Sequence, residues 1–435
     1  MSDSLAKVVA ALAPRLIEWR RDLHAHPEVG WTEFRTAALV AERLDALGWQ
    51  VAVGAEVVDA GARMGVPDAG TLAAACERAR REGADEAWLA RLGDGLTGVV
   101  ATLDSGRPGP TLAIRVDMDA LPVAESEAAR HRPKSDGFVS RHAGAMHACG
   151  HDGHTAIGLG LAEVLVAQRS SLHGRVKLVF QPAEEGVRGA AAMVAAGVVD
   201  DVDRLIALHL GLGCDSGTVL CGCDGFLATH KLDVVFTGQA AHAGGAPEAG
   251  RNALLAAAQA VTGLYAIAPH SAGPARLNVG RMTAGTGRNV IADRAELEIE
   301  TRGATTAIDD YMRERAEQVI AGAAQAQGVG YELRCVGRAV ECASSPGWVG
   351  EIAQRLHGLP GIDRIIDHDA RPRGSEDATA LMARVRERGG EAAYMIFGAD
   401  RPAGHHQPDF DIDESVLAVA LRALAEIVEA VGDAA

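Results

Sequence analysis

The stretch Met146-His147-Ala148-Cys149-Gly150-His151-Asp152-Gly153-His154 places a thiol and an imidazole two residues apart, with a glycine between them. Thiolate and imidazole are both good ligands for a borderline-soft divalent metal. The residues that follow, from Thr155 to Val166, are apolar with a helical period, so the stretch is predicted to lie at a strand-to-helix turn. The N-terminus of such a helix favours a deprotonated thiol. The alternative is a loop of one cysteine and several histidines that holds no metal.

The length and charge of the chain limit the number of domains and the kinds of partner that it can have. At 435 residues the chain is too long for one ordinary hydrophobic core, so two domains are expected. The formal net charge of −16 argues against a nucleic acid or an anionic membrane as partner. A small acidic substrate stays compatible with this charge, because distant charges are screened over about 10 Å.

The cysteines and the N-terminal segment both indicate the cytoplasm. Seven scattered cysteines, an odd number, are typical of a reducing compartment. Residues 2–19 show the pattern of an amphipathic helix, without the basic start and continuous apolar core of a signal peptide. No apolar run reaches the length of a transmembrane helix. We therefore expect a cytoplasmic protein without a membrane partner.

The pattern of the first half predicts an α/β sheet with helices on its faces. The first helix is expected to end near His26-Pro27, with His26 capping helix carbonyls. A polar, helix-forming insertion is expected at about 54–97. The expected strands are 50–53, 99–103, 112–116, 176–180 and 205–208.

The pattern changes near Leu227, where a smaller domain is expected to interrupt the larger one. Its strands and helices follow in the order β-α-β-β-α-β, which fits a ferredoxin-like α+β domain. The larger domain resumes near Ala343 and is expected to end with a helix at 414–431. The expected domains are 1–226 and 339–435 for the larger domain and 227–338 for the smaller one. The smaller domain's expected strands are 232–236, 277–282, 296–301 and 331–336, and its helices are 252–267 and 308–325.

Polar side chains follow the ends of several expected strands, where ligands gather in α/β sheets. They lie in the segments 115–119, 181–185, 208–210 and 404–410. The adjacent pair Glu184-Glu185 is the most informative, because neighbouring carboxylates in an extended segment point to opposite sides. One can bind a metal while the other acts as general base on a water that the metal acidifies. The alternative is a solvated acidic turn.

An ordered set of motifs resembles the M20 metallopeptidase family, in its amidohydrolase branch, over nearly the whole chain. The resemblance implies a zinc-exopeptidase-like α/β catalytic domain, with a mixed β-sheet flanked by helices, interrupted by a lid and dimerisation domain. The motifs are RVDMDALP (115–122), MHACGHDGH (146–154), FQPAEEG (180–186), ALHLG (207–211), GQAAHAGGAPEAGRNAL (238–254), GRNVIAD (287–293), GSEDAT (374–379) and HHQPDFDIDE (405–414).

The resemblance also implies two divalent metal ions, zinc or manganese, bridged by Cys149. His151 and His209 would complete one site, and Glu185 and His406 the other. Glu184 would be the general base, and Asp117 would steady a ligand imidazole. This chain has Arg115 where many M20 enzymes place a metal-binding histidine, so His151 is expected to replace that ligand.

The smaller domain is expected to contribute to the substrate site. His242 resembles a histidine that stabilises the oxyanion, often from a partner subunit. Asn289 and Arg302 match positions near the substrate carboxylate, although Arg302 is equally well explained as a surface arginine at a strand end. The implied partner is a second copy of the chain or a related B subunit.

The resemblance implies hydrolysis of the amide bond of N-acyl amino acids. The expected substrates resemble p-aminobenzoyl-glutamate and yield the acid and free glutamate; the alternative is an indole-3-acyl or other N-acyl amino acid. Two rivals belong to other classes. A binding protein that has lost activity would lack Glu184 or several ligands, and none is missing. A thiol oxidoreductase would need Cys149 free of metal.

Overall fold

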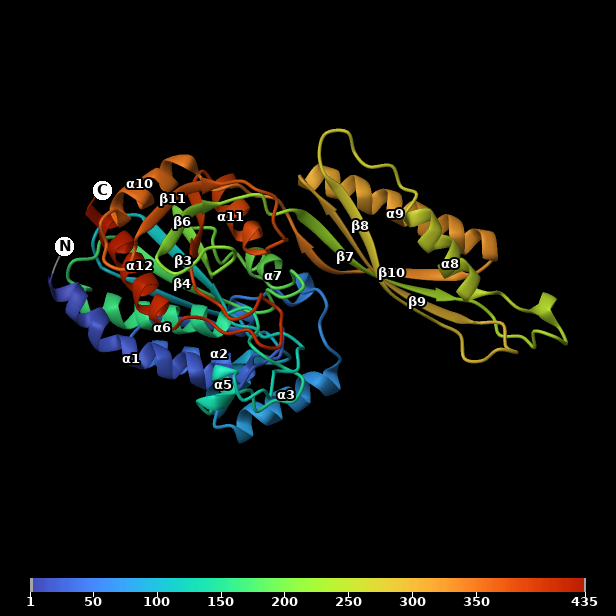
Figure 1. Cartoon of the computed structure of the whole chain (residues 1–435), viewed down its shortest axis with the longest axis horizontal. Helices are drawn as coiled ribbons and strands as arrows, with labels where there is room; N and C mark the ends of the chain where they lie inside the picture. The colour runs from blue at the N-terminus through green and yellow to red at the C-terminus, as the bar shows by residue number, and fades with distance from the viewer. Residues whose placement is uncertain (1–2, 434–435) are drawn as a thin grey trace. The chain divides into compact units, whose positions relative to one another are not determined.

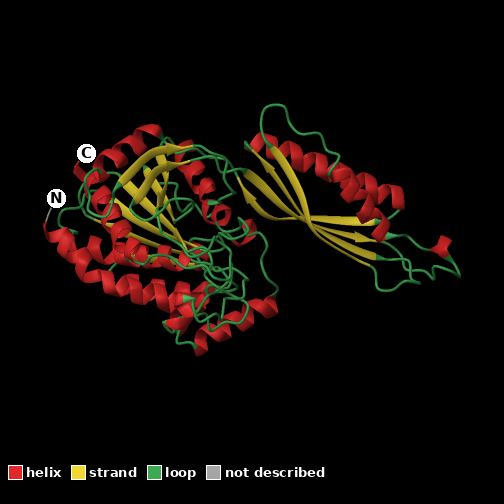
Figure 2. Cartoon of the chain, in the orientation of Figure 1, coloured by secondary structure: helices red, strands yellow, loops and turns green. Residues whose placement is uncertain are grey.

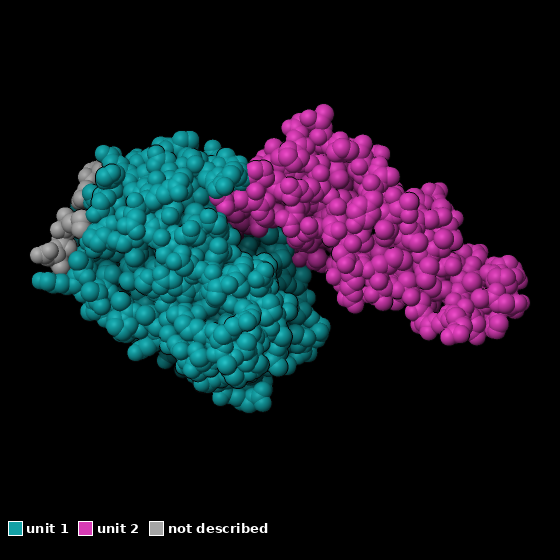
Figure 3. Space-filling model, in the orientation of Figure 1, with its two compact units in different colours: residues 1–224, 342–371, 377–435 teal, residues 225–341, 372–376 magenta. Residues whose placement is uncertain are grey.

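The computed structural model describes residues 3–433 and divides into two compact units. The first unit comprises residues 1–224, 342–371 and 377–435, and the second comprises residues 225–341 and 372–376 (Figure 3). The boundaries thus fall after residues 224 and 341 instead of 226 and 338. Residues 372–376, expected in the larger domain, group with the second unit, because the backbones of Arg373 and Gly374 hydrogen-bond to Gly225 and Leu227.

The first unit is built on a mixed eight-stranded sheet with the order β1-β2-β4-β3-β5-β12-β6-β11. Helices surround this sheet (Figures 1 and 2). Four neighbouring strands, β4, β3, β5 and β12, are parallel. Their carboxyl ends therefore meet at one edge, where α/β proteins bind ligands. The strands are β1 (Gln50–Val53), β2 (Val99–Asp104), β3 (Thr111–Asp117), β4 (Arg175–Gln181), β5 (Arg204–Leu210), β6 (Thr218–Cys223), β11 (Arg364–Asp369) and β12 (Glu391–Phe397).

Helix α6 (His151–Ala167) begins within the stretch 146–154, where metal ligands were predicted, and is buried along most of its length. Two glycines allow its neighbours to approach closely. A Cβ on Gly160 would lie 2.5 Å from Leu16 of α1, and a Cβ on Gly158 would lie 2.8 Å from Phe180 of β4. Outside the insertion after β1, the other described α-helices of this unit are α1 (Asp3–Ala25), α2 (Phe34–Ala46), α5 (Arg132–Ser135), α7 (Ala190–Ala195), α10 (Pro346–Leu356), α11 (Ala378–Glu387) and α12 (Ser415–Asp433).

The insertion after β1 folds into two α-helices that pack against α2 and two short 3-10 turns, of which η2 contacts α7. Asp68 and Asp85 accept hydrogen bonds from backbone amides at the helix starts, which is ordinary N-capping. The elements are η1 (Gly54–Glu56), η2 (Ala60–Ala62), α3 (Ala69–Arg81) and α4 (Glu86–Leu92). Among residues 3–433, no helix is long and apolar enough to cross a membrane.

The second unit has the β-α-β-β-α-β order and an antiparallel sheet with the strand order β10-β7-β9-β8. Its core forms between that sheet and the two long helices, with many small alanines along α8. Strands β8 and β10 are the two edges of the sheet. The elements are β7 (Ala228–Thr237), η3 (Pro247–Ala249), α8 (Ala253–Leu264), β8 (Ala275–Ala284), β9 (Arg294–Gly303), α9 (Thr306–Gln327) and β10 (Gly330–Ala339).

Candidate metal centre

The carboxyl-terminal edge of the parallel strands brings together the predicted ligands of the first unit. Asp117 ends β3, the loop of Glu184 and Glu185 follows β4, and His209 lies near the end of β5. Gly150 adopts a left-handed backbone (φ 96°) as N-cap of α6, which turns the chain between Cys149 and His151.

The side chains form two overlapping groups that share Cys149. In one group the ligand atoms of Cys149, His151 and His209 all lie within 4.8 Å of one another. The other group contains Cys149, Glu185 and His406, within the same limit. The five residues expected to be ligands are thus brought together in the arrangement that a shared thiolate would require.

The spacing and chemistry of these atoms fit divalent metal ions. Cys149 Sγ lies 3.5 Å from His209 Nε2, and Glu185 Oε1 lies 3.5 Å from His406 Nε2. Two ligands of one tetrahedral zinc lie about 3.3 to 3.6 Å apart, given Zn–S of about 2.3 Å and Zn–N of about 2.0 Å. Among the described residues, the buried atoms His151 Nε2 and Glu185 Oε1 find no hydrogen-bond partner, which is unusual for buried polar atoms.

Backbone carbonyls orient two of the imidazoles. His151 Nδ1 donates to the carbonyl of Asp119 at 2.8 Å, and His209 Nδ1 donates to the carbonyl of Leu210 at 2.8 Å. In both rings Nδ1 is occupied by a carbonyl, so Nε2 is the atom that a metal would use.

Asp117 lies between two imidazoles. Its Oδ1 accepts a 2.6 Å hydrogen bond from Nδ1 of His154, and it lies 3.8 Å from Nδ1 of His151, the candidate ligand. Nε2 of His154 accepts a 2.9 Å hydrogen bond from the amide of Leu210, so neither nitrogen of His154 is open to a metal. Arg115 is buried against Asp117 at 2.8 Å and is likewise no ligand. Asp117 and His154 thus fix the backbone beside His209.

Asp119 organises the glutamate loop, a role that the sequence did not reveal. Its carboxylate accepts hydrogen bonds from the amides of Glu184 at 3.0 Å and Glu185 at 2.9 Å. The carbonyl of the same residue orients His151. The Glu184 carboxylate lies 3.9 Å from His151 Nε2, and its side chain is 11% exposed, so a water can reach it.

The pKa shifts of the candidate ligands indicate that their site lacks positive charge. Burial and the neighbouring Glu185 raise the pKa of the Cys149 thiol well above its ordinary value. Burial raises the pKa of Glu185 to about 7. Burial opposes the protonation of His151, yet the charge of Asp117 raises the pKa of its imidazole well above the usual range. A divalent cation would supply the missing charge and keep the thiol deprotonated.

The adjacent histidines His405 and His406 have different environments. His405 contacts the Arg401 guanidinium at 2.5 Å, and burial together with that charge lowers its pKa to about 3. His406 faces Glu185 and has a left-handed backbone (φ 64°), uncommon for a residue other than glycine. Ala183, next to Glu184, is also left-handed (φ 50°). Such strained residues cluster at functional sites.

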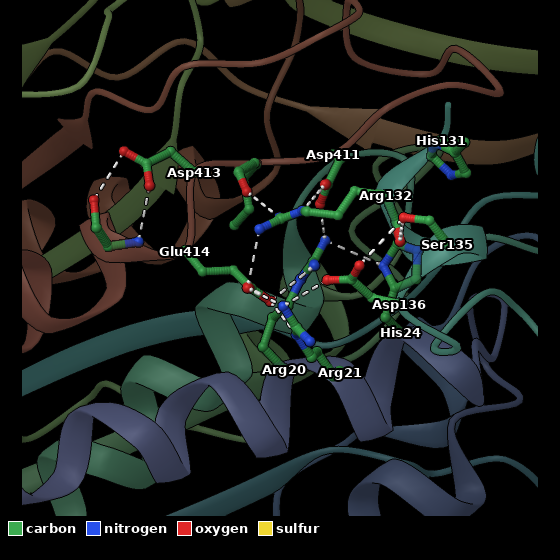
Figure 4. Close-up of polar contacts among 12 residues, drawn as sticks. Arg20, Arg21, His24, His131, Arg132, Ser135, Asp136, Asp411, Asp413 and Glu414 are labelled. Atoms are coloured by element: carbon green, nitrogen blue, oxygen red, sulfur yellow. Dashed lines mark hydrogen bonds and ion pairs between the residues drawn. The ribbon is translucent and has the colours of Figure 1, made fainter. Parts of the chain in front are cut away.

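A buried ion network holds the first turn of α6. Arg20 of α1 pairs with Asp152, which follows His151, at 2.9 Å and with Asp411 at 2.8 Å. Arg132 also pairs with Asp411, at 2.6 Å, and both arginines contact Glu414 (Figure 4). The network ties α1, α6 and the segment before α12 together beneath the candidate ligands.

The remaining predicted site residues belong to the second unit. His242 lies in the loop between β7 and α8, and Nδ1 of its exposed ring accepts hydrogen bonds from the amides of Gly244 and Gly245. Asn289 is adjacent, since its carbonyl accepts from the amide of Ala243. Arg302 lies towards the other end of β9, with its guanidinium paired to Glu300 at 3.0 Å. Within this unit, Arg302 is therefore not grouped with His242 and Asn289.

Comparisons with a family model and with known sequences indicate the same protein family. The model of peptidase family M20/M25/M40 matches residues 113–430. The chain is 58% identical to indole-3-acetyl-aspartic acid hydrolase of Enterobacter agglomerans, with 97% of each chain covered. It is 56% identical to one of the subunits of p-aminobenzoyl-glutamate hydrolase of Escherichia coli, again with 97% of each chain covered.

Solved structures agree with the sequence relatives. The aminobenzoyl-glutamate utilization protein of Klebsiella pneumoniae matches with a TM-score of 0.86 and 53% identity, covering 98% of each chain. The YXEP protein of Bacillus subtilis, described as a dinuclear metal binding peptidase from the M20 family, matches with a TM-score of 0.65 and 26% identity over 98% of this chain and 99% of that one. The chain belongs to peptidase family M20/M25/M40.

Proposed function

We propose that the protein hydrolyses the amide bond between an acyl group and the nitrogen of an amino acid, with two divalent metal ions. The observation that carries the proposal is the pair of ligand groups sharing Cys149, with Glu184 beside them. Cys149, His151 and His209 would hold one ion, and Cys149, Glu185 and His406 the other. The ligand set of thiolate, imidazole and carboxylate suits zinc and also admits manganese.

The residues of the chain have separate tasks in this reaction. The bound ions supply Lewis-acid activation of the amide carbonyl and of water. Glu184 takes a proton from the attacking water and returns it to the nitrogen of the leaving amino acid, as general base and then general acid. Asp119 keeps the Glu184 and Glu185 amides in place, and Asp117 acts through His154 on the strand end that carries His209.

The substrate proposal follows the two sequence relatives named above. Their names specify an aromatic acyl group joined to aspartate or glutamate. We favour substrates like p-aminobenzoyl-glutamate, which yield the aromatic acid and glutamate; the indole-3-acyl amino acids are the alternative. Both classes use the same metal ions and the same Glu184.

The second unit is proposed to act as lid and dimerisation domain. Nδ1 of His242 accepts two amide hydrogens, so the proton of its neutral ring lies on Nε2, where it can be donated to an oxyanion. Asn289 is proposed to bind the substrate carboxylate. Arg302 can do so only after it releases Glu300.

The partner of that unit is proposed to be a second copy of the chain or a related B subunit. The open edge of β8 and several exposed apolar side chains support an interface there. These side chains are Leu254, Leu255, Tyr265, Met282 and Val290. The described cysteines form no disulfide with one another, in keeping with the proposed cytoplasmic location.

A substrate panel tests the proposed function. The purified protein, loaded with zinc or manganese, is assayed on p-aminobenzoyl-glutamate, indole-3-acetyl-aspartate and the N-acetyl forms of both amino acids. We expect release of the free amino acid, with the highest kcat/KM on an aromatic acyl substrate. An enzyme that releases no amino acid from any of them with either metal would refute the proposal.

A further inference from the structure

We infer that the segment Arg63–Pro67 of the insertion forms an apolar wall that receives the aromatic acyl group of the substrate, with Met64 and Val66 as its contact residues. This inference rests on the proposed function and assigns the acyl side of the same site. Three features of the first unit support it: two independent anchors to the glutamate loop, and the exposed apolar side chain between them.

The first anchor is Trp31. Its indole Nε1 donates to the carbonyl of Met64 at 2.8 Å, and the Arg63 guanidinium lies over its ring at 5.5 Å. Trp31 is fully buried and has a left-handed backbone (φ 68°), which is a strained conformation for a large side chain. The preceding residue, Gly30, packs so closely on the glutamate loop that a Cβ would lie 3.1 Å from Ala183.

The second anchor is Arg188, which follows the catalytic glutamates. Its Nε donates to the carbonyl of Glu185 at 2.9 Å, and its NH1 donates to the carbonyl of Gly65 at 3.0 Å. One guanidinium group therefore spans the distance between the glutamate loop and the segment. A Cβ on Gly30 would lie 2.4 Å from Arg188, so the glycine leaves the room that this side chain occupies.

The side chains of the segment suit an aromatic group better than a carboxylate. Val66 is 38% exposed, and among the described residues it is the one large exposed hydrophobic side chain of the first unit. Met64 beside it is half-buried, and methionine adapts well to aromatic surfaces. The nearby cations are engaged by carbonyls: Arg63 donates to Asp94 at 2.7 Å, and Arg188 makes the two bonds described above.

The test compares substrates that differ on one side of the amide only. Val66→Ala and Met64→Ala are assayed on p-aminobenzoyl-glutamate and on N-acetyl-glutamate. We expect kcat/KM on the aromatic substrate to fall about 10-fold, chiefly through KM, because a few apolar contacts are lost. The values on N-acetyl-glutamate should stay within a factor of about two. Val51→Ala, the same change at a half-buried site on β1, should alter neither.

Arg188 is a positioning residue, and its variants test the second anchor. Lysine keeps the charge but cannot bridge two carbonyls, so Arg188→Lys should reproduce the aromatic-selective rise in KM, with metal content and melting temperature close to those of the wild type. Equal losses on both substrates would mean that Arg188 only supports the glutamate loop, and would overturn this part of the inference.

If the wild-type enzyme is active, three results would refute the proposed apolar wall. The first is an unchanged kcat/KM in the Val66 and Met64 variants, and the second is an equal loss of kcat/KM on both substrates. The third is a loss of kcat/KM in these variants that changes when the glutamate of the substrate is replaced by glutamine. A wild-type enzyme inactive on every N-acyl amino acid would instead refute the proposed function first, and this inference with it.

Discussion

Cys149 is the one residue that both candidate metal groups share. Replacing it by serine should weaken the retention of both ions, because a hydroxyl is a poorer anionic bridge than a thiolate at neutral pH. Elemental analysis after dialysis would show less than full occupancy. Cys76→Ser, a change at a half-buried cysteine of the insertion, should keep the metal content of the wild type. Two fully occupied sites in Cys149→Ser would remove Cys149 from the bridge.

Glu184 can be tested without disturbing the ligands. Glu184→Gln keeps the size of the side chain but removes the base, so turnover should fall by about 10²-fold or more while the metals are retained. The measurement is kcat on an N-acyl amino acid, together with metal content. Near-native turnover at unchanged metal content would show that another group is the base.

The candidate ligand residues could be named from the sequence, but the residues that support them could not. Cysteine, histidine and paired glutamates at strand ends carry a recognisable chemistry. Asp119 acts through backbone amides 65 and 66 residues away in the sequence, and nothing in its local pattern reveals that. His154 has the same chemistry as a ligand, and only its two hydrogen bonds in the folded chain exclude it.

The junction of α1, α6 and the segment before α12 depends on buried charge. Burial alone would raise the pKa of Asp411, but the hydrogen bond from Arg132 and the charge of Arg20 lower it below its ordinary value. A carboxylate with a lowered pKa contributes stability above its unfolded pKa of about 4, and that contribution is lost as the pH falls through the folded value. Acid should therefore loosen this junction.

The Asp411→Asn variant tests this dependence. At neutral pH it should be destabilised by about 3 kcal/mol, because one partner of a buried pair is removed. Its melting temperature should fall less than that of the wild type between pH 5 and pH 3. Asp200→Asn, at an exposed pair with Arg384, should leave both measurements nearly unchanged. An unaltered acid dependence in Asp411→Asn would contradict the role of this pair.

At the scale of elements, the sequence predicted the first five strands of the large sheet but missed its last three, of which β6 and β12 are buried. The apolar runs of β2 to β5 lie within one or two residues of the predicted ranges. Strands β6, β11 and β12 were not predicted: β11 is a polar, largely exposed edge strand, and β6 carries a glycine between two cysteines. Their pairing depends on partners far along the chain.

The division into two units leads to a prediction about subunits. His242→Ala should lower kcat by about 10²-fold with both metals retained, if the exposed ring donates to the oxyanion. His270 provides a control in the same unit, because its Nδ1 also accepts a backbone amide hydrogen, at 3.1 Å. His270→Ala should keep the activity of the wild type.

Subunit exchange shows whether His242 acts across an interface. Inactive His242→Ala chains are mixed with inactive Glu184→Gln chains and allowed to exchange. A histidine that acts in trans restores one complete site in each mixed dimer, and part of the activity returns. If exchange is demonstrated and no activity returns, His242 serves its own subunit.

The sequence pattern predicts an interrupting second domain, but it does not predict the order of the strands in the large sheet. The β-α-β-β-α-β order of the second unit leaves few arrangements of its strands. Strand β12, by contrast, lies between β5 and β6 although about 170 to 190 residues separate them in the sequence. The local sequence of β12 does not indicate which distant strands it pairs with.

The central place of β12 bears on how the protein is made at the ribosome. The second unit consists almost wholly of one continuous segment, residues 225–341, and can fold as soon as that segment has emerged. The first unit has to wait, because β12 and the loop of His406 come after residue 390, behind the whole of the second unit's segment. A nascent chain that has just completed β10 already carries Cys149, His151, Glu185 and His209. It exposes the flank of β5 until β12 has been made, so the interval before residue 391 is when the chain depends most on protection from aggregation.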